Sequence, residues 1–141
     1  MQRFFMLFLL SLLIVEFTNG CSCRYFLNQE LFCQSHFVIK VQVTSTEKLG
    51  ELEGYRYHVD ILETYRATNE GKKVLELKYL ETQPFNGMCG RYLRNDDVVI
   101  VGGHITSDGI PYINICGLEM IPTDDVYVDL RENFPKNCMA S

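Results

Sequence analysis

The sequence predicts a small, mainly β domain: a five-stranded Greek-key barrel with flanking short helices, held together by three disulfides. Five short segments between residues 37 and 116 are rich in Val, Ile and Tyr and are separated by Gly, Asn and Asp, which is typical of strands and turns. A helix signal lies on either side of these segments. All six cysteines follow an apolar leader, and exported chains fold where paired thiols are oxidised.

Residues 1–20 have the pattern of a signal peptide. Arg3 gives the segment a positive start, and the run from Phe4 to Val15 is almost entirely apolar. This run is shorter than the roughly 20 residues needed to span a bilayer, so we expect no membrane anchor. We therefore expect a secreted, extracellular protein whose mature domain, residues 21–141, begins at Cys21.

The predicted elements follow in chain order. A short helix begins after Asn28, and five strands come next. Ser107, Asp108 and Gly109 tolerate positive φ, so they predict a hairpin turn between the last two strands. The predicted strands are Phe37 to Thr46, Tyr55 to Tyr65, Val74 to Leu80, Asp97 to Ile105, and Ile110 to Cys116.

Two further segments complete the expected domain. Residues 81–89 show no periodicity and predict an irregular loop between the third and fourth strands. A longer helix is expected to begin at Thr123, because Val126, Leu130 and Phe134 recur every four residues and form one apolar stripe. Five strands with flanking helices match the oligonucleotide- and oligosaccharide-binding (OB) barrel.

Composition excludes several functions that such a barrel can carry. The net charge is −5, whereas nucleic-acid binding requires a basic groove, so we expect no nucleic-acid partner. No serine or histidine lies in a recognisable nucleophile motif, and the thiols are expected to be paired, so we expect no enzyme activity and no cofactor. The sequence therefore favours a protein that binds another protein.

Six cysteines allow fifteen disulfide pairings, and their number alone selects none of them. A zinc site is the alternative use of these thiols, but the chain lacks Cys-x-x-Cys pairs and its three histidines are scattered singly. Disulfides are therefore the favoured interpretation. The cysteines are Cys21, Cys23, Cys33, Cys89, Cys116 and Cys138.

The cysteine pattern resembles the amino-terminal, netrin-like domain of the tissue inhibitors of metalloproteinases. The expected mature start is Cys21-Ser22-Cys23, and Cys33 follows after nine intervening residues. The likeness extends over essentially the whole mature chain. Its other matching segments are Gln29 and Phe32, Val38-Ile39-Lys40, Cys89-Gly90, and Ile113-Asn114-Ile115-Cys116.

The resemblance implies a pairing, a mechanism and a set of contact residues. The implied bridges are Cys21–Cys89, Cys23–Cys116 and Cys33–Cys138. The implied function is inhibition of secreted or cell-surface zinc metalloproteases by a monomer, in which the backbone nitrogen and oxygen of Cys21 chelate the protease's zinc. The implied inhibitory and protease-contact residues are Cys21, Ser22, Cys23, Arg24, Phe85, Asn86, Gly87 and Met88.

Alternatives stay open at these positions. Pro84 and Gly87 can simply turn the chain while Phe85 and Met88 fill a gap beneath it, and Ser22 can be an exposed, inert residue. The alternative function is a non-inhibitory netrin-like binding module that recognises a receptor, matrix or immune protein.

The sequence also departs from the family pattern. Arg24 and Tyr25 replace the small residue and the proline usual after the second cysteine, and the connection from Ser45 to Gly54 is expected to be compact. Because the chain stops just after Cys138, we expect no second cysteine-rich domain.

Overall fold

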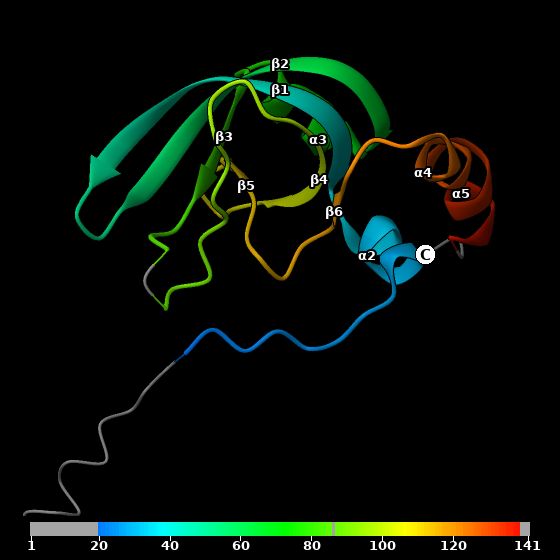
Figure 1. Cartoon of the computed structure of the whole chain (residues 1–141), viewed down its shortest axis with the longest axis horizontal. Helices are drawn as coiled ribbons and strands as arrows, with labels where there is room; N and C mark the ends of the chain where they lie inside the picture. Colours follow the sequence, from blue (N-terminus) through cyan, green and yellow to red (C-terminus); the bar gives the residue numbers. More distant parts are fainter. Residues whose placement is uncertain (1–19, 86, 139–141) are drawn as a thin grey trace, which may run out of the picture.

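Five strands close into a ring in the computed structural model, which describes residues 20–85 and 87–138 (Figure 1). The strands of the sheet are β1 (Phe37–Gly50), β2 (Gly54–Ala67), β3 (Tyr79–Thr82), β4 (Val98–Ile105), β5 (Pro111–Tyr112) and β6 (Glu119–Met120). The ring runs β1-β2-β3-β5-β4 and returns to β1, and β6 pairs with β4. Only the β3–β5 pairing in this part of the chain is parallel. This closure confirms the predicted OB-type barrel.

The interior of the barrel is filled by alternate side chains of the strands. On β1, Phe37, Ile39 and Val41 point into the main core, whereas Val38 points outward into a second cluster. Strand side chains alternate between the two faces, so one strand can supply both cores. The first half of β1 therefore has a nearly continuous apolar sequence because both of its faces are covered.

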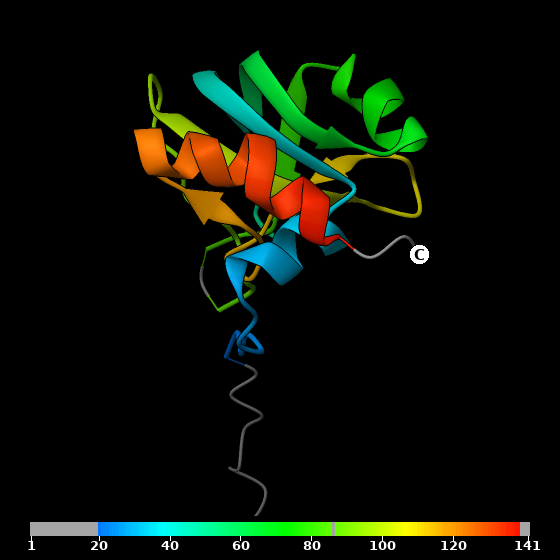
Figure 2. The same ribbon diagram turned by 90° about the vertical axis from the view of Figure 1, so that its right-hand side faces the viewer.

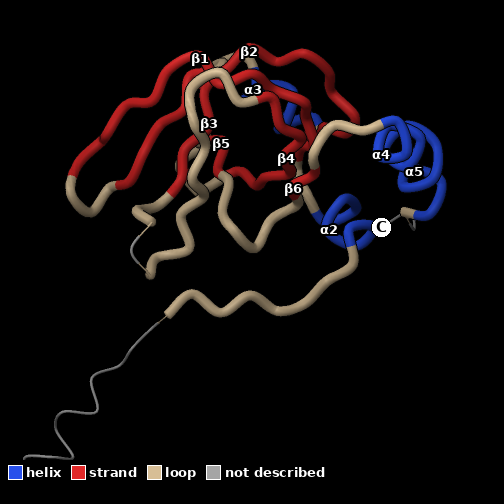
Figure 3. The backbone as a smooth tube through the Cα atoms, viewed as in Figure 1, coloured by secondary structure: helices blue, strands red, loops and turns tan. Residues whose placement is uncertain are grey.

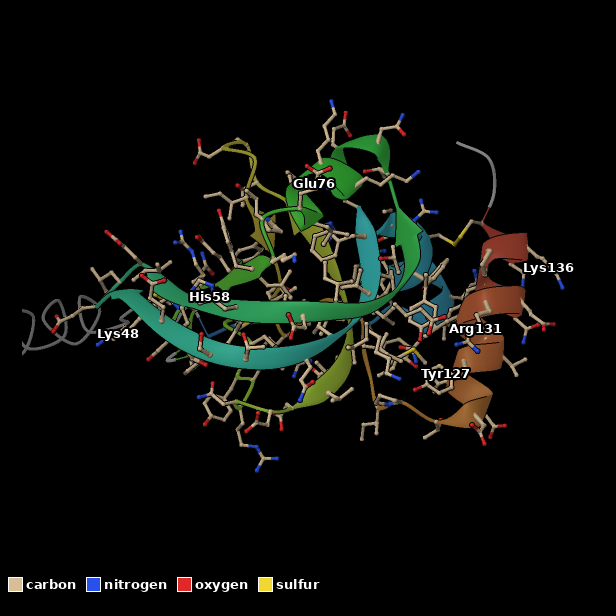
Figure 4. All side chains as sticks on the ribbon, turned by 90° about the horizontal axis from the view of Figure 1, so that it is seen from above. Lys48, His58, Glu76, Tyr127, Arg131 and Lys136 are labelled. Carbon is tan, nitrogen blue, oxygen red and sulfur yellow. A yellow bond between two sulfur atoms is a disulfide. The ribbon has the colours of Figure 1, made fainter. Side chains whose placement is uncertain are left out.

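Strands β1 and β2 form one long hairpin that projects from the ring. They pair from Phe37 opposite Ala67 to Gly50 opposite Gly54, with several bulges in the register. Figure 4 shows Lys48 near the far end of this hairpin. The connection from Ser45 to Gly54 is not a separate loop: strand pairing continues through most of it, and only residues 51–53 turn the chain.

A helix precedes β3 where the sequence predicted only a strand. Helix α3 (Asn69–Leu75) follows Thr68, whose hydroxyl accepts a hydrogen bond from the Gly71 N–H at 3.0 Å and so caps the first turn. The expected strand from Val74 to Leu80 is wrong in its first part, because pairing begins only at Tyr79.

The predicted hairpin between β4 and β5 is confirmed, although β5 is much shorter than expected. The Thr106 N–H donates to the Ile110 carbonyl at 3.0 Å, and Gly109 turns the chain at φ 77°. The expected strand from Ile110 to Cys116 is wrong beyond Tyr112, where regular pairing ends. The short strand β6 was not predicted.

Helices cover the outer face of β1 and β4 (Figure 2). Helix α2 (Asn28–Gln34) precedes the barrel, and the C-terminal helix runs through α4 (Asp124–Val128), a π-helical turn η1 (Asp129–Asn133) and α5 (Phe134–Asn137). None of the helices in the described residues is long and apolar enough to cross a membrane. The buried side chains between helices and barrel are Phe32, Val38, Ile100, Leu118 and Leu130.

Polar contacts also attach the C-terminal helix to the barrel. Arg131 donates to both carboxylate oxygens of Glu63 on β2 at 2.8 Å, and Lys40 Nζ donates to the Tyr127 hydroxyl at 2.6 Å. Figure 4 shows Tyr127 and Arg131 on the side of the helix that faces the strands. The Arg131 bonds are the main cause that lowers the pKa of Glu63.

Candidate functional site

The expected mature amino terminus forms an extended segment beneath the barrel. Residues 20–27 have no regular secondary structure and run below the loops that follow β3 and β5 (Figures 1 and 3). The segment ends at α2, where the Leu27 N–H donates to Glu30 Oε2 at 2.9 Å. No strand pairing holds it, so its position depends on covalent ties.

Two disulfides supply these ties. Cys21 is bonded to Cys89 in the loop after β3, with 5.1 Å between the Cα atoms, and Cys23 is bonded to Cys116 after β5, with 5.2 Å between the Cα atoms. The third bridge joins Cys33 on α2 to Cys138 at the end of α5. These are the three pairs that the family resemblance implies.

The two terminal bridges lie against each other. The sulfur of Cys21 is 3.9 Å from that of Cys116, which is a packing contact between neighbouring disulfides. The Ile115 N–H donates to the Cys89 carbonyl at 3.0 Å, so the two receiving loops are also bonded to each other. Cys21, Cys23 and Cys116 are the only cluster of three metal-ligand side chains in the described residues, but as disulfides they offer no thiolate to an ion.

The residues that follow Cys21 are exposed on this fixed segment. Ser22 and Arg24 are both exposed, and the Arg24 guanidinium lies over the Phe26 ring, 5.5 Å from its centroid. Tyr25 is 86% exposed. The amino-terminal segment therefore presents a short row of accessible side chains on both sides of Cys23.

The second expected contact strip divides between packing and exposure. Phe85 stacks on Tyr55 with ring centroids 4.4 Å apart and packs against the barrel core, so it fills the gap beneath the loop. Gly87 turns the chain at φ 74°, and both Gly87 and Met88 are exposed. Asn86 lies outside the described residues. The structure thus separates Phe85, an anchor of the loop, from Gly87 and Met88, which face solvent.

Tyr57 and Gly90 fix the base of this loop, although no structural role was predicted for either of them. The buried Tyr57 hydroxyl donates to the Arg91 carbonyl at 2.8 Å and accepts from the Leu93 N–H at 3.2 Å, and its burial raises the pKa of the phenol. A side chain at Gly90 would collide with the Gln83 carbonyl, so glycine allows the two ends of the loop to meet. Burial of one tyrosine within the barrel has no local sequence signal.

Ile115 is a further exposed residue that the sequence analysis did not assign to the site. It is 41% exposed beside Cys89, whereas Ile113 is only 2% exposed. A strict period of two places residues 113 and 115 on the same face of a strand, and Asn114 breaks this pattern. The Asn114 side chain accepts from the Cys116 N–H at 2.9 Å and turns the chain toward the bridge.

Comparison with known proteins gives a consistent family assignment for the chain. A sequence model of the family described as "Tissue inhibitor of metalloproteinase" matches residues 19–128. A Drosophila melanogaster protein named "Tissue inhibitor of metalloproteinase" is 33% identical over 98 residues, which cover 70% of this chain and 44% of that protein. The residues that the family model matches include both bridges at the amino terminus.

Two vertebrate proteins named "Metalloproteinase inhibitor 3" are also similar. The protein from Scyliorhinus torazame is 27% identical over 130 residues, which cover 90% of this chain and 58% of that protein. The protein from Xenopus laevis is 30% identical over 103 residues, which cover 71% of this chain and 46% of that protein. The chain spans about half the length of the curated relatives it matches.

Proposed function

The chain belongs to the family of tissue inhibitors of metalloproteinases, and from this membership we propose that it is a secreted inhibitor of zinc metalloproteases. One observation carries the proposal: Cys21 and Cys23 are bridged to two loops that are bonded to each other, so the expected mature terminus is fixed at the surface with Ser22 exposed. A fixed terminus loses little conformational entropy when it docks into a cleft.

The inhibitory chemistry proposed for this terminus is chelation. Cleavage before Cys21 frees an α-amino nitrogen that, with the Cys21 carbonyl oxygen, can close a five-membered ring on a metal. A catalytic zinc has three protein ligands and keeps one position for water, which this chelate displaces. An α-amine has an ordinary pKa of about 8, so it gives up its proton to a metal at modest cost near neutral pH.

The surroundings of the terminus suit a protein interface. Tyr25, Met88 and Ile115 are 86%, 40% and 41% exposed, and they lie close to Cys23, Cys89 and Cys116 in the chain. Tyrosine and methionine are enriched in interfaces, and apolar surface favours association. In the proposed complex Ser22 enters the protease's specificity pocket, while Gly87 and Met88 contact the rim of the cleft.

The proposed extracellular location and the proposed inhibitory role agree with the family and with the disulfides. The family is one of inhibitors and not of enzymes, as the absence of a nucleophile motif led us to expect. Three disulfides fit an oxidising, extracellular location. The proposed partners are secreted or cell-surface zinc metalloproteases bound by a monomer.

Extension of the terminus tests the chelate directly. One alanine added before Cys21 acylates the coordinating nitrogen and places a new residue in the space of the metal. We expect affinity for a metalloprotease to fall by orders of magnitude while the melting temperature stays unchanged, because the bridges do not use that nitrogen. Both quantities are measured on one preparation, and acetylation of the native α-amine serves as a second variant with less added bulk.

Two results would contradict the proposal in different ways. A folded, extended protein that inhibits as strongly as the parent excludes the terminal chelate but leaves inhibition in place. A parent that inhibits none of a panel of zinc metalloproteases excludes inhibition itself. The alternative, a non-inhibitory netrin-like binding module, then becomes the leading hypothesis, and affinity capture can seek its partner.

A further inference from the structure

An aromatic groove lies between the β1–β2 hairpin and residues 92–95, which follow the loop after β3. Its volume is about 280 Å³, and Phe85 and Tyr55 form one wall as a stacked pair. The Tyr92 ring stands at 86° to Phe85 with 5.2 Å between centroids and is 63% exposed, while Leu93 is buried at the base. The groove thus combines a stacked aromatic pair with one accessible ring.

The size of the groove restricts what it can hold. Pockets for drug-sized ligands and cofactors are usually about 300–1,000 Å³, so this groove lies just below that range. It suits a single large side chain, and aromatic walls favour an apolar or aromatic partner through offset or edge-on contact. Thr46, Arg94 and Asn95 supply polar groups to the rest of the lining, and the Thr46 hydroxyl donates to Asn95 Oδ1 at 2.9 Å, which connects the hairpin to the segment after the loop.

The groove lies near the proposed inhibitory edge, which consists of the terminus around Cys21 and Cys23 and the loop at Gly87 and Met88. Phe85 forms a wall of the groove and is four residues from Cys89, so their Cα atoms lie within about 14 Å of each other. Cys89 is in turn 5.1 Å from Cys21, measured between Cα atoms. A standard interface covers about 800 Å² on each partner, which corresponds to a patch roughly 30 Å across. One protease surface can therefore cover both the terminus and the groove.

We propose that this aromatic groove receives an apolar side chain from the surface of the bound metalloprotease, beside its active-site cleft. This inference rests on the proposed inhibitory function and adds to it a second, metal-independent anchor. Aromatic residues in pockets commonly dominate interface energies, whereas most surrounding contacts contribute little. The groove would thus add affinity and select proteases by the side chain that they present to it.

The test fills or opens the groove and leaves the terminus unchanged. Thr46→Trp places a large ring in the groove, and Thr44→Trp is the matched control, two residues earlier on the same strand and outside the groove lining. For a metalloprotease that the parent inhibits, we expect Thr46→Trp to raise the inhibition constant roughly 10- to 30-fold, mainly through faster dissociation, and Thr44→Trp to match the parent.

Tyr92→Ala provides a second variant whose folding is safer, because Tyr92 is largely exposed. We expect it to weaken inhibition in the same direction, with a melting temperature close to that of the parent. If Thr46→Trp and Tyr92→Ala are folded and inhibit like the parent, the groove inference is wrong while the proposed function stands. If the parent inhibits no metalloprotease, the proposed function and the groove inference fail together.

Discussion

Ser22 and Arg24 are exposed neighbours of Cys23, and the disulfides restrain the positions of the two residues to different degrees. Ser22 lies between two bridged cysteines, so its position is fixed from both sides. Arg24 has a bridge on one side only, and its guanidinium is held over Phe26. In the proposed complex the smaller side chain enters a pocket, and the larger one meets the rim of the protease cleft.

Substitution of these two residues tests the edge at the scale of single side chains. Ser22→Gly removes the hydroxyl from the specificity pocket and is expected to weaken inhibition of every protease bound. Arg24→Ala is expected to shift the preference among proteases, because a rim charge acts through complementarity with each partner. Inhibition constants for a protease panel measure both effects, and parental values for both variants would mean that this edge is not the contact surface.

At the scale of elements, the C-terminal helix is attached to the barrel by contacts of two kinds. Leu130 is buried in the outer cluster, whereas Arg131 on the next position bonds Glu63 at the surface. Surface ion pairs contribute little to stability, so burial of the apolar stripe provides most of the attachment. The ion pair instead makes part of the attachment dependent on pH.

The sign of this pH dependence follows from the lowered pKa of Glu63. The contribution of the Glu63–Arg131 ion pair to the free energy of unfolding is complete above the ordinary glutamate pKa of about 4.3. It is lost as the pH falls through the lowered pKa that Glu63 has in the folded protein. Arg131→Gln should therefore lower the melting temperature slightly at pH 7, and the difference from the parent should shrink below about pH 4.3 and vanish once the pH lies below the lowered pKa of Glu63. Arg66→Gln is the control, since Arg66 donates to the Ser35 carbonyl, which does not titrate. A pH-independent difference for Arg131→Gln would contradict this account.

The sequence predicted the long elements well, because their patterns arise from burial. Val126, Leu130 and Phe134 do pack in the outer cluster, as their four-residue spacing indicated. The π-helical turn was not predicted, although Pro135 gives a physical reason for it: proline lacks an amide hydrogen and disturbs regular helical bonding. The spacing of apolar residues shows which face of a helix is buried. It does not show where the backbone changes from α-helical to π-helical hydrogen bonding.

Short elements were predicted poorly because a few residues carry no period. Helix α3 has only seven residues, and its best signal was local: Thr68 as the cap and Glu70 in the first turn. Strand β6 has two residues and exists only because β4 lies beside it. In the candidate site, the cysteine pattern indicated the terminus, while the role of Phe85 as an anchor depended on Tyr55, thirty residues away in sequence.

At the scale of the whole molecule, the three bridges divide into two groups with separate tasks. Two hold the terminus against the loops, and the third joins the first helix of the described chain to the end of the last one, across 105 residues. In the chain-entropy model each bridge stabilises the fold by restricting the unfolded chain, and long loops give the larger effects. All three bridges therefore stabilise the fold, but only the first two also hold the terminus to which inhibition is proposed to belong.

The double variant Cys33→Ala/Cys138→Ala tests this division and leaves no free thiol. We expect it to lose about 2–5 kcal/mol in the free energy of unfolding. At temperatures where it remains folded, it should inhibit like the parent, because Cys21 and Cys23 keep their partners. Denaturant unfolding and inhibition assays provide the two measurements. A folded variant with much weaker inhibition would show that the terminus depends on the helices.

The bridges also determine the order in which the protein can mature during synthesis. Cys21 and Cys23 are among the first mature residues made, but their partners follow 68 and 93 residues later. At about 5–20 residues per second, the second delay is roughly 5–20 s. Until Cys89 is made, Cys33 is the only other thiol in the mature chain, so the correct pairs must form after a period in which only wrong ones are available. The oldest part of the chain is therefore among the last to acquire its structure, and a ribosome-bound fragment that ends before Cys116 cannot present the finished terminus.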